Sequence, residues 1–166
     1  MTRFETRSAA GTEALGRALA ACLRRGTLVA LYGDLAAGKT CLVRGVAAAF
    51  GGAEPAHSPT FVVAHVYRGR ETVHHLDLYR LQGVDELIDI GFEELAEPDG
   101  ITLVEWAERA AALLPTPHVA VQLEHAGGDT RHVVIEDAGG LLAAGWPGTL
   151  ATAPGVVLLD QRINQA

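Results

Sequence analysis

The stretch Gly33-Asp34-Leu35-Ala36-Ala37-Gly38-Lys39-Thr40 fits the pattern G-x-x-x-x-G-K-[ST]. The apolar run Thr27 to Tyr32 before it is typical of a buried strand. The residues that follow, up to Phe50, favour a helix that Gly51-Gly52 ends. A strand before the loop and a helix after it are the context that this pattern requires. The sequence therefore predicts a phosphate-binding loop (P-loop) at Gly33 to Thr40.

Each residue type in this loop has a physical role in binding phosphate. Glycines let backbone N–H groups converge on an anion without interference from Cβ atoms. The helix that begins at Lys39 directs the positive end of its dipole toward the same point. We expect Lys39, the only lysine of the chain, to face solvent and reach the β- and γ-phosphates, and Thr40 to ligate the metal. The expected cofactors are ATP and Mg²⁺.

The rest of the chain alternates strand-like and helix-like segments. A capped helix is expected from Thr12 to about Arg25, and a hairpin around Arg68-Gly69-Arg70. The other predicted helices span 39–50, 85–90 and 106–114, and the predicted strands span 27–32, 61–67, 72–78, 101–104, 119–123, 132–136 and 156–159. This order predicts one α/β P-loop NTPase domain with a mixed, mostly parallel sheet and helices on both faces. We assign residues 1–137 to this domain and residues 138–166 to an Ala-, Gly- and Pro-rich tail that could pack on it.

Two acidic residues end predicted strands and are candidates for the second metal ligand of a P-loop site. Glu105 ends Ile101 to Val104, and Asp77 ends Thr72 to Leu76. In P-loop proteins an acid at such a position holds Mg²⁺ directly or through water. A residue that caps a helix or faces water would give the same pattern. We nevertheless expect catalytic and metal-binding roles for both carboxylates.

The segment Ser58-Pro59-Thr60 carries a further candidate, because P-loop switch proteins often use a threonine there to sense the γ-phosphate. The same segment is equally typical of an ordinary turn. His74 and His75 precede Asp77 and invite a separate metal site. Neighbouring residues of a strand point to opposite faces, so these two side chains are poorly placed to share one ion.

Composition and charge narrow the class of protein. The net charge of −7 and the pI of about 5.4 argue against strong autonomous binding to nucleic acid, which depends on Lys and Arg. No apolar run approaches the ~20 residues that cross a bilayer, and the N-terminus lacks the apolar core of a signal peptide. Cys22 and Cys41 are expected in helices as reduced, buried thiols. We expect a cytoplasmic protein without membrane contact.

An ordered set of motifs resembles one known family. The set consists of Gly-Asp-Leu-x-Ala-Gly-Lys-Thr at 33–40, Ser-Pro-Thr-Phe at 58–61, His-Leu-Asp-Leu-Tyr-Arg-Leu at 75–81 and Leu-Val-Glu-Trp at 103–106. In this order and spacing it is similar to the TsaE (formerly YjeE) family, bacterial ATPases of tRNA threonylcarbamoyladenosine biosynthesis. The resemblance covers roughly residues 8 to 136. It implies an ATPase that supports turnover of TsaB and TsaD, with tRNA contacted only indirectly through that complex.

The resemblance also implies roles for individual residues. Thr40 and Glu105 would ligate Mg²⁺, Asp77 would assist hydrolysis or the metal's water shell, and Thr60 would act as a switch. The nucleotide-binding set comprises the P-loop with Cys41, the N-terminal Ser8 and Thr12, and Trp106 and Arg131. The chain departs from the family pattern at three positions: Ala36 replaces a usual Gly, Cys41 a usual Thr and Ala107 a usual Pro. Ala36 would restrict the loop if that position needs a positive φ.

Three other functions are alternatives to an ATPase of this family, and each makes its own demands on the sequence. A GTPase reads its base with Asn-Lys-x-Asp, and this chain has one Lys, in the P-loop, and one Asn, Asn164. A small-molecule kinase needs an acceptor pocket and usually an Arg-rich lid. The arginines of this chain are scattered, and the sequence shows no insertion typical of a lid. A nucleotide-gated assembly factor with incidental hydrolysis stays open, because binding and hydrolysis use the same loop.

Overall fold

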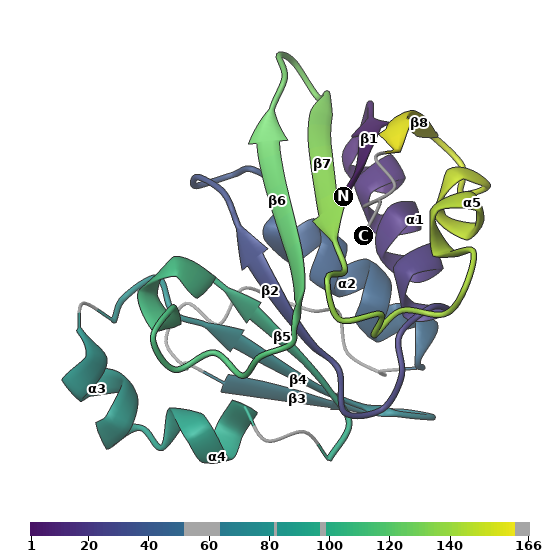
Figure 1. The fold of residues 1–166 in the computed structure, drawn as a ribbon. Coiled ribbons are helices and arrows are strands. Elements are labelled where there is room, and N and C mark those ends of the chain that lie inside the picture. Colours follow the sequence, from purple (N-terminus) through teal and green to yellow (C-terminus); the bar gives the residue numbers. More distant parts are fainter. Residues whose placement is uncertain (52–63, 82, 97–98, 162–166) are drawn as a thin grey trace.

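Residues 1–51, 64–81, 83–96 and 99–161 are described by a computed structural model of the chain. Within them, eight strands form one mixed sheet in the order β3-β4-β5-β2-β6-β7-β1-β8 (Figure 1). Its centre is parallel and comprises β4 (Thr72–Asp77), β5 (Ile101–Glu105), β2 (Leu28–Tyr32) and β6 (Val119–His125). The predicted class, an α/β domain with a mixed sheet around a parallel core, is confirmed.

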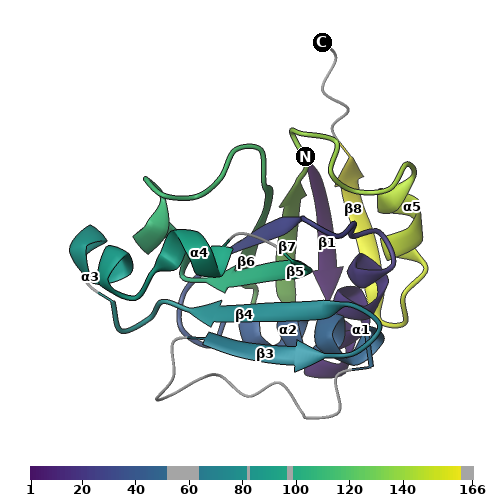
Figure 2. The ribbon, with the colours of Figure 1, turned by 90° about the horizontal axis from the view of Figure 1, so that it is seen from below.

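Antiparallel strands complete both sides of this parallel centre. On one side β3 (Ala64–Arg68) pairs with β4, which is the predicted hairpin, and Figure 2 shows β3, β4 and β5 next to one another. On the other side follow β7 (Arg131–Glu136), β1 (Thr2–Thr6) and β8 (Val156–Gln161). The parallel strands are therefore internal to the sheet, where both of their faces can be covered.

Helices cover both faces of the sheet (Figure 1). Helices α1 (Ala9–Ala20), α2 (Lys39–Ala49) and α5 (Trp146–Ala151) pack on one face. Helices α3 (Val84–Asp89) and α4 (Phe92–Ala96) and the 3-10 helix η1 (Ala107–Ala110) pack on the other. Strand β2 alternates accordingly, with Val29 and Leu31 in the first core and Leu28 and Ala30 in the second. None of the described helices is long and apolar enough to cross a membrane.

Several short elements differ from the sequence-based expectation. Helix α1 begins before Thr12, because Ser8 is its N-cap and accepts the N–H of Gly11 at 3.0 Å. Strand β1 was not predicted, since Phe4 is the only apolar residue in TRFET. The sequence pattern does not predict α4 or α5 either, because α4 has only five residues and α5 contains Pro147 and Gly148, which are poor helix formers. The helix predicted over 106–114 is wrong, since Trp106 has φ 59° and only the 3-10 turn η1 follows.

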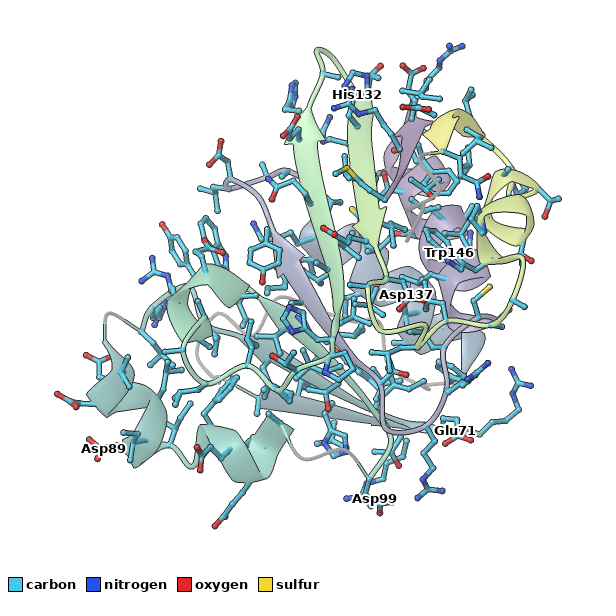
Figure 3. The ribbon with its side chains drawn as sticks, viewed as in Figure 1. Glu71, Asp89, Asp99, His132, Asp137 and Trp146 are labelled. Carbon is cyan, nitrogen blue, oxygen red and sulfur yellow. The ribbon has the colours of Figure 1, made fainter. Side chains whose placement is uncertain are left out.

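The segment after Asp137 adds to the core that α1 covers. Leu142 is buried, and its N–H donates to the Asp137 carboxylate at 3.0 Å. The ring of Trp146 lies 6.3 Å from the ring of Phe4, and β8 pairs with β1. Figure 3 labels Asp137 and Trp146 on the side of the molecule where α1, α5 and β8 lie. The first core cluster therefore draws residues from both ends of the chain.

Two glycines let α1 and α2 approach each other closely. A Cβ on Gly16 of α1 would lie 2.2 Å from the carbonyl oxygen of Leu42 in α2. A Cβ on Gly45 of α2 would lie 2.1 Å from the carbonyl oxygen of Glu13 in α1. Both obstacles are backbone atoms of the opposite helix, which cannot rotate away as a side chain could. These contacts set the position of α2, the helix that follows the P-loop.

We predict that Gly16→Ala and Gly45→Ala destabilise the protein although alanine is the better helix former. The helix propensity gained is at most about 1 kcal/mol, whereas overpacking against rigid backbone costs about 1–3 kcal/mol or more. Thermal melts should show a midpoint several degrees below that of the wild type. The matched control is Gly148→Ala in α5, where a Cβ meets nothing within 4 Å. Equal melting points for Gly16→Ala, Gly45→Ala and Gly148→Ala would contradict the close helix contact.

Candidate functional site

The predicted P-loop connects β2 to α2 at the carboxyl end of the parallel strands. Gly33 and Gly38 have φ angles of 135° and 107°, which side-chain-bearing residues rarely adopt. A Cβ on Gly33 would also lie 2.3 Å from the carbonyl oxygen of Leu123 in β6. Ala36 has φ 62°, so the position where the family usually has glycine is left-handed here too. The loop therefore adopts a conformation that its two glycines permit and that alanine at position 36 strains.

Lys39 is folded back over its own loop. Its side chain is buried rather than solvent-facing as expected, and it donates hydrogen bonds to the carbonyl oxygens of Gly33 and, at 2.9 Å, of Asp34. The ammonium nitrogen also lies 3.8 Å from the centre of the Trp106 ring, a cation–π contact. Burial lowers the pKa of Lys39, and the nearby carboxylates of Glu105, Glu108, Asp77 and Asp34 oppose that shift. The one lysine of the chain is thus surrounded by carbonyl oxygens, carboxylates and an aromatic face.

Thr40 and Glu105 meet beside the loop. The Thr40 hydroxyl lies 2.9 Å from Oε1 and 3.1 Å from Oε2 of Glu105, whose side chain is only 4% exposed. His75 contacts the same carboxylate, with its Nε2 2.9 Å from Oε1. Glu105 thus joins the first turn of α2 to the ends of β4 and β5. The family resemblance predicts Thr40 and Glu105 together, but no sequence pattern predicts a role for His75 at this site.

Asp77 lies next to Glu105 because β4 and β5 are in parallel register. Their Cα atoms are direct partners in the sheet, and one Asp77 oxygen accepts the N–H of Tyr79 at 3.0 Å. Both side chains line a cavity of about 430 Å³ together with the loop residues. The residues that line it are Leu35, Ala36, Ala37, Gly38, Lys39, Thr40, Cys41, Asp77, Tyr79, Glu105 and Trp106. The two predicted acids and the P-loop therefore share one cavity.

Two aromatic side chains, Tyr79 and Trp106, also line this cavity. Trp106 has the left-handed angles φ 59° and ψ 43°, which direct the chain away from β5 immediately after Glu105. The Tyr79 and Trp106 rings lie 4.9 Å apart. The guanidinium of Arg109 lies 5.8 Å from the Trp106 ring and donates to the carbonyl oxygen of Leu81. Trp106 belongs to the predicted nucleotide-binding set and Tyr79 does not, although Tyr79 follows Asp77 at the same strand end.

Two further predicted residues lie against the P-loop from other elements. Arg131, at the start of β7, donates to the carbonyl oxygen of Ala36 at 3.3 Å. Thr12 of α1 is buried and shares a 2.8 Å hydrogen bond with Thr6, and its methyl group is 3.7 Å from where a Cβ of Gly38 would be. Ser8 instead lines a separate cavity of about 640 Å³ beside the turn between α5 and β8. Its predicted place in the nucleotide-binding set stays a prediction.

The remaining candidates are Cys41 and Thr60. Cys41 is half-buried rather than buried, and its Sγ lies 2.9 Å from a guanidinium nitrogen of Arg44. Cys22 is buried but lies in the turn after α1 instead of in a helix. Thr60, with the Ser58-Pro59 that precedes it, lies outside the described residues. Its switch role stays a prediction.

Comparison with known proteins points to one family. The family model "Threonylcarbamoyl adenosine biosynthesis protein TsaE" matches residues 6–133. A tRNA threonylcarbamoyladenosine biosynthesis protein TsaE from Treponema pallidum is 39% identical over 133 residues, which are 80% of this chain and 98% of that protein. The TsaE of Streptomyces coelicolor is 40% identical over 134 residues, covering 75% and 89% of the two chains. The matched region contains both the P-loop and Glu105.

Structure comparison agrees with the sequence matches. The crystal structure of YdiB from Bacillus subtilis superposes with a TM-score of 0.64 at 29% identity, covering 81% of this chain and 86% of that one. A TsaE from the same organism is 34% identical over 129 residues, covering 77% of this chain and 80% of that protein. The P-loop, the neighbouring strand-end acids and these matches together show that the chain belongs to the TsaE family of tRNA threonylcarbamoyladenosine biosynthesis.

Proposed function

We propose that this chain binds ATP with Mg²⁺ in the P-loop cavity and hydrolyses it as a subunit of the cytoplasmic threonylcarbamoyladenosine machinery. The observation that carries the proposal is the contact between the Thr40 hydroxyl and the Glu105 carboxylate, at 2.9 and 3.1 Å, beside the P-loop. A hydroxyl from the first helical turn and an acid from a neighbouring strand are the protein ligands of Mg²⁺ in P-loop NTPases.

The loop has the features needed to hold the phosphates. Its glycines adopt positive φ angles, and α2 begins directly after Gly38, so backbone N–H groups and the helix dipole act on the same anion. Lys39 supplies the positive charge. Its present bonds to the carbonyl oxygens of Gly33 and Asp34 would have to yield to phosphate oxygens, which form stronger, charge-assisted bonds with an ammonium group.

The donor set suits Mg²⁺ better than a softer metal. Mg²⁺ prefers oxygen ligands and is usually bound by one or two carboxylates together with substrate phosphates and water. Thr40 and Glu105 offer such oxygens, and Asp77 lies beside Glu105 on the adjacent strand. Groups of three or more His, Cys, Asp or Glu side chains that could form a closed metal site are absent from the described residues. Thr40 and Glu105 would hold the ion, which neutralises charge on the phosphates when bound, and Asp77 would orient water.

Family membership favours hydrolysis over phosphoryl transfer to a small molecule. The relatives are named for tRNA threonylcarbamoyladenosine biosynthesis, and the resemblance implies TsaB and TsaD as partners. A net charge of −7 favours a chain that contacts tRNA only through those partners. Two cations near the loop are already engaged: Arg109 stacks on Trp106, and Arg131 bonds the carbonyl oxygen of Ala36. An additional charge on the γ-phosphate in the transition state would therefore come from a partner.

We predict that Lys39→Ala abolishes the stabilisation of the protein by Mg·ATP. A ligand at a hundred times its Kd adds about 2.7 kcal/mol to the free energy of unfolding, and this gain should vanish without the charge that contacts phosphate. Thermal melts with and without Mg·ATP measure this stabilisation. The melt without nucleotide shows separately how much the loss of the buried ammonium destabilises the fold. The control is Arg25→Ala, which removes an exposed cation paired with Asp99 instead. A full ligand-induced shift in Lys39→Ala would rule out the P-loop assignment.

We predict that Glu105→Gln lowers the rate of ATP hydrolysis by orders of magnitude while nucleotide affinity changes far less. Glutamine keeps the shape of the side chain but removes the negative charge that holds the metal. Steady-state phosphate release over a range of Mg²⁺ concentrations should show a weaker metal dependence. Glu94→Gln, an exposed carboxylate on α4, is the matched control. Unchanged turnover in Glu105→Gln would transfer the metal-binding role to Asp77.

We predict slow hydrolysis by the chain alone and faster hydrolysis with TsaB and TsaD from the same source. A charge placed on the γ-phosphate by a partner can raise the rate of P-loop NTPases by several orders of magnitude. Phosphate release is measured for the purified chain and then for the mixture, first in a single turnover and then at steady state. A rate that is already fast alone and indifferent to both partners would contradict partner-gated turnover. ADP formed without free phosphate when small acceptors are added would instead indicate a kinase.

A further inference from the structure

His75 is in direct contact with the carboxylate of Glu105. Its side chain is fully buried, and its Nε2 is 2.9 Å from Oε1 of Glu105. His75 belongs to β4, where successive side chains alternate between the two faces of the sheet. Its ring therefore lies on the same face as Val73 and Asp77, which is the face that α2 covers. Its Cα partner in β5 is Leu103, two residues before Glu105, so the imidazole reaches diagonally toward the end of the neighbouring strand. The same alternation directs the adjacent His74 to the opposite face.

Hydrogen-bond chemistry assigns the direction of this contact. An ionised carboxylate can only accept, so Nε2 is the protonated nitrogen of the His75 ring and donates to Oε1. The other ring nitrogen, Nδ1, is buried and has no partner among the described residues. A buried imidazole surrounded by apolar residues contributes less to stability than a well-packed apolar side chain would, unless its polar atoms are satisfied. A histidine at position 75 can donate a hydrogen bond to Glu105, which an apolar residue could not do.

The contact restrains one oxygen of Glu105 more than the other. Oε1 lies within hydrogen-bond distance of both His75 and Thr40, whereas among the described residues Oε2 has Thr40 alone, at the longer distance of 3.1 Å. A glutamate side chain has three rotatable bonds, and an outer hydrogen bond reduces the number of orientations its carboxylate can take. The Tyr67 ring, 6.3 Å from the His75 ring with 24° between their planes, stacks beside the imidazole. His75 thus restrains the carboxylate at Oε1, and Oε2 is the less restrained oxygen.

We propose that His75 is a positioning residue that orients the Glu105 carboxylate for the metal ion of the bound nucleotide. This role rests on the Mg·ATP site proposed above, to which it adds His75 as the residue that hydrogen-bonds the proposed metal ligand Glu105. Groups that hydrogen-bond a metal-binding carboxylate from the outer side typically contribute 10–100-fold to metal affinity. His75 acts on the carboxylate alone, so loss of its donor should weaken metal binding and leave metal-free nucleotide binding nearly unchanged.

The test compares His75→Asn, His75→Gln and His74→Asn with the wild type. The side-chain nitrogen of glutamine is as many bonds from Cα as Nε2 of histidine, so His75→Gln keeps a donor near Oε1, whereas the shorter asparagine does not. His74→Asn changes the neighbouring imidazole on the opposite face and serves as the matched control. Mn²⁺, which can be followed by electron paramagnetic resonance, is titrated into each protein with saturating ADP. Nucleotide-free melts and the Mg²⁺ dependence of phosphate release accompany the titration.

The expected result is an apparent Kd for Mn²⁺ about 10–100-fold higher in His75→Asn, with His75→Gln closer to the wild type and His74→Asn equal to it. Wild-type Mn²⁺ affinity in His75→Asn, with only its melting point lowered, would overturn the proposal and leave His75 a core residue. An absence of ADP-dependent Mn²⁺ binding in the wild type would instead refute the Mg·ATP site itself.

Nuclear magnetic resonance of the wild-type ring supplies a test that needs no variant. The imidazole ¹⁵N shifts should show a proton on Nε2 of His75, and a ring protonated only on Nδ1 would contradict the donated bond.

Discussion

The parallel register of β4, β5 and β2 is the constraint on which the site depends. In this register Asp77 pairs with Glu105, and Glu105 pairs with Leu31, two residues before the P-loop. Parallel strands end at the same edge of a sheet, so the two acids and the loop converge there. They are far apart in sequence, because the loop begins at Gly33 and the acids are Asp77 and Glu105. The Thr40–Glu105 contact, 65 residues apart in sequence, follows directly from this arrangement.

The helix that follows the P-loop is positioned by the helix next to it. Gly16 and Gly45 bring the backbones of α1 and α2 into contact, and the first turn of α2 carries Lys39 and Thr40. The same packing puts Thr12 of α1 close to Gly38, at the start of that turn. Helix packing and phosphate-loop geometry are therefore parts of one arrangement, in which the position of α2 depends on residues that touch neither carboxylate.

The side chains of the site differ in how they are held. Glu105 and His75 are buried and hydrogen-bonded to each other, which favours a fixed orientation. Lys39 donates to carbonyl oxygens of its own loop and lies on the Trp106 ring, with the carboxylates of Glu105 and Asp77 nearby. The left-handed backbone of Trp106 keeps that ring over the lysine. The proposed metal ligand Glu105 is thus fixed at a strand end, whereas the proposed phosphate ligand Lys39 is held only by hydrogen bonds within its own loop and by an aromatic ring.

The sequence by itself determined the P-loop and the central strands, because these depend on local patterns of glycine and of apolar runs. It offered both Asp77 and Glu105 as strand-end acids, and the strand register decides which of them meets Thr40. It did not determine β1, α4 or α5, because β1 has one apolar residue, α4 has only five residues, and α5 contains Pro147 and Gly148. Only the tertiary structure placed His75 behind Glu105 and buried Lys39 beneath Trp106. Those contacts join residues far apart in the chain, and no local spacing encodes the strand register and helix packing that bring them together.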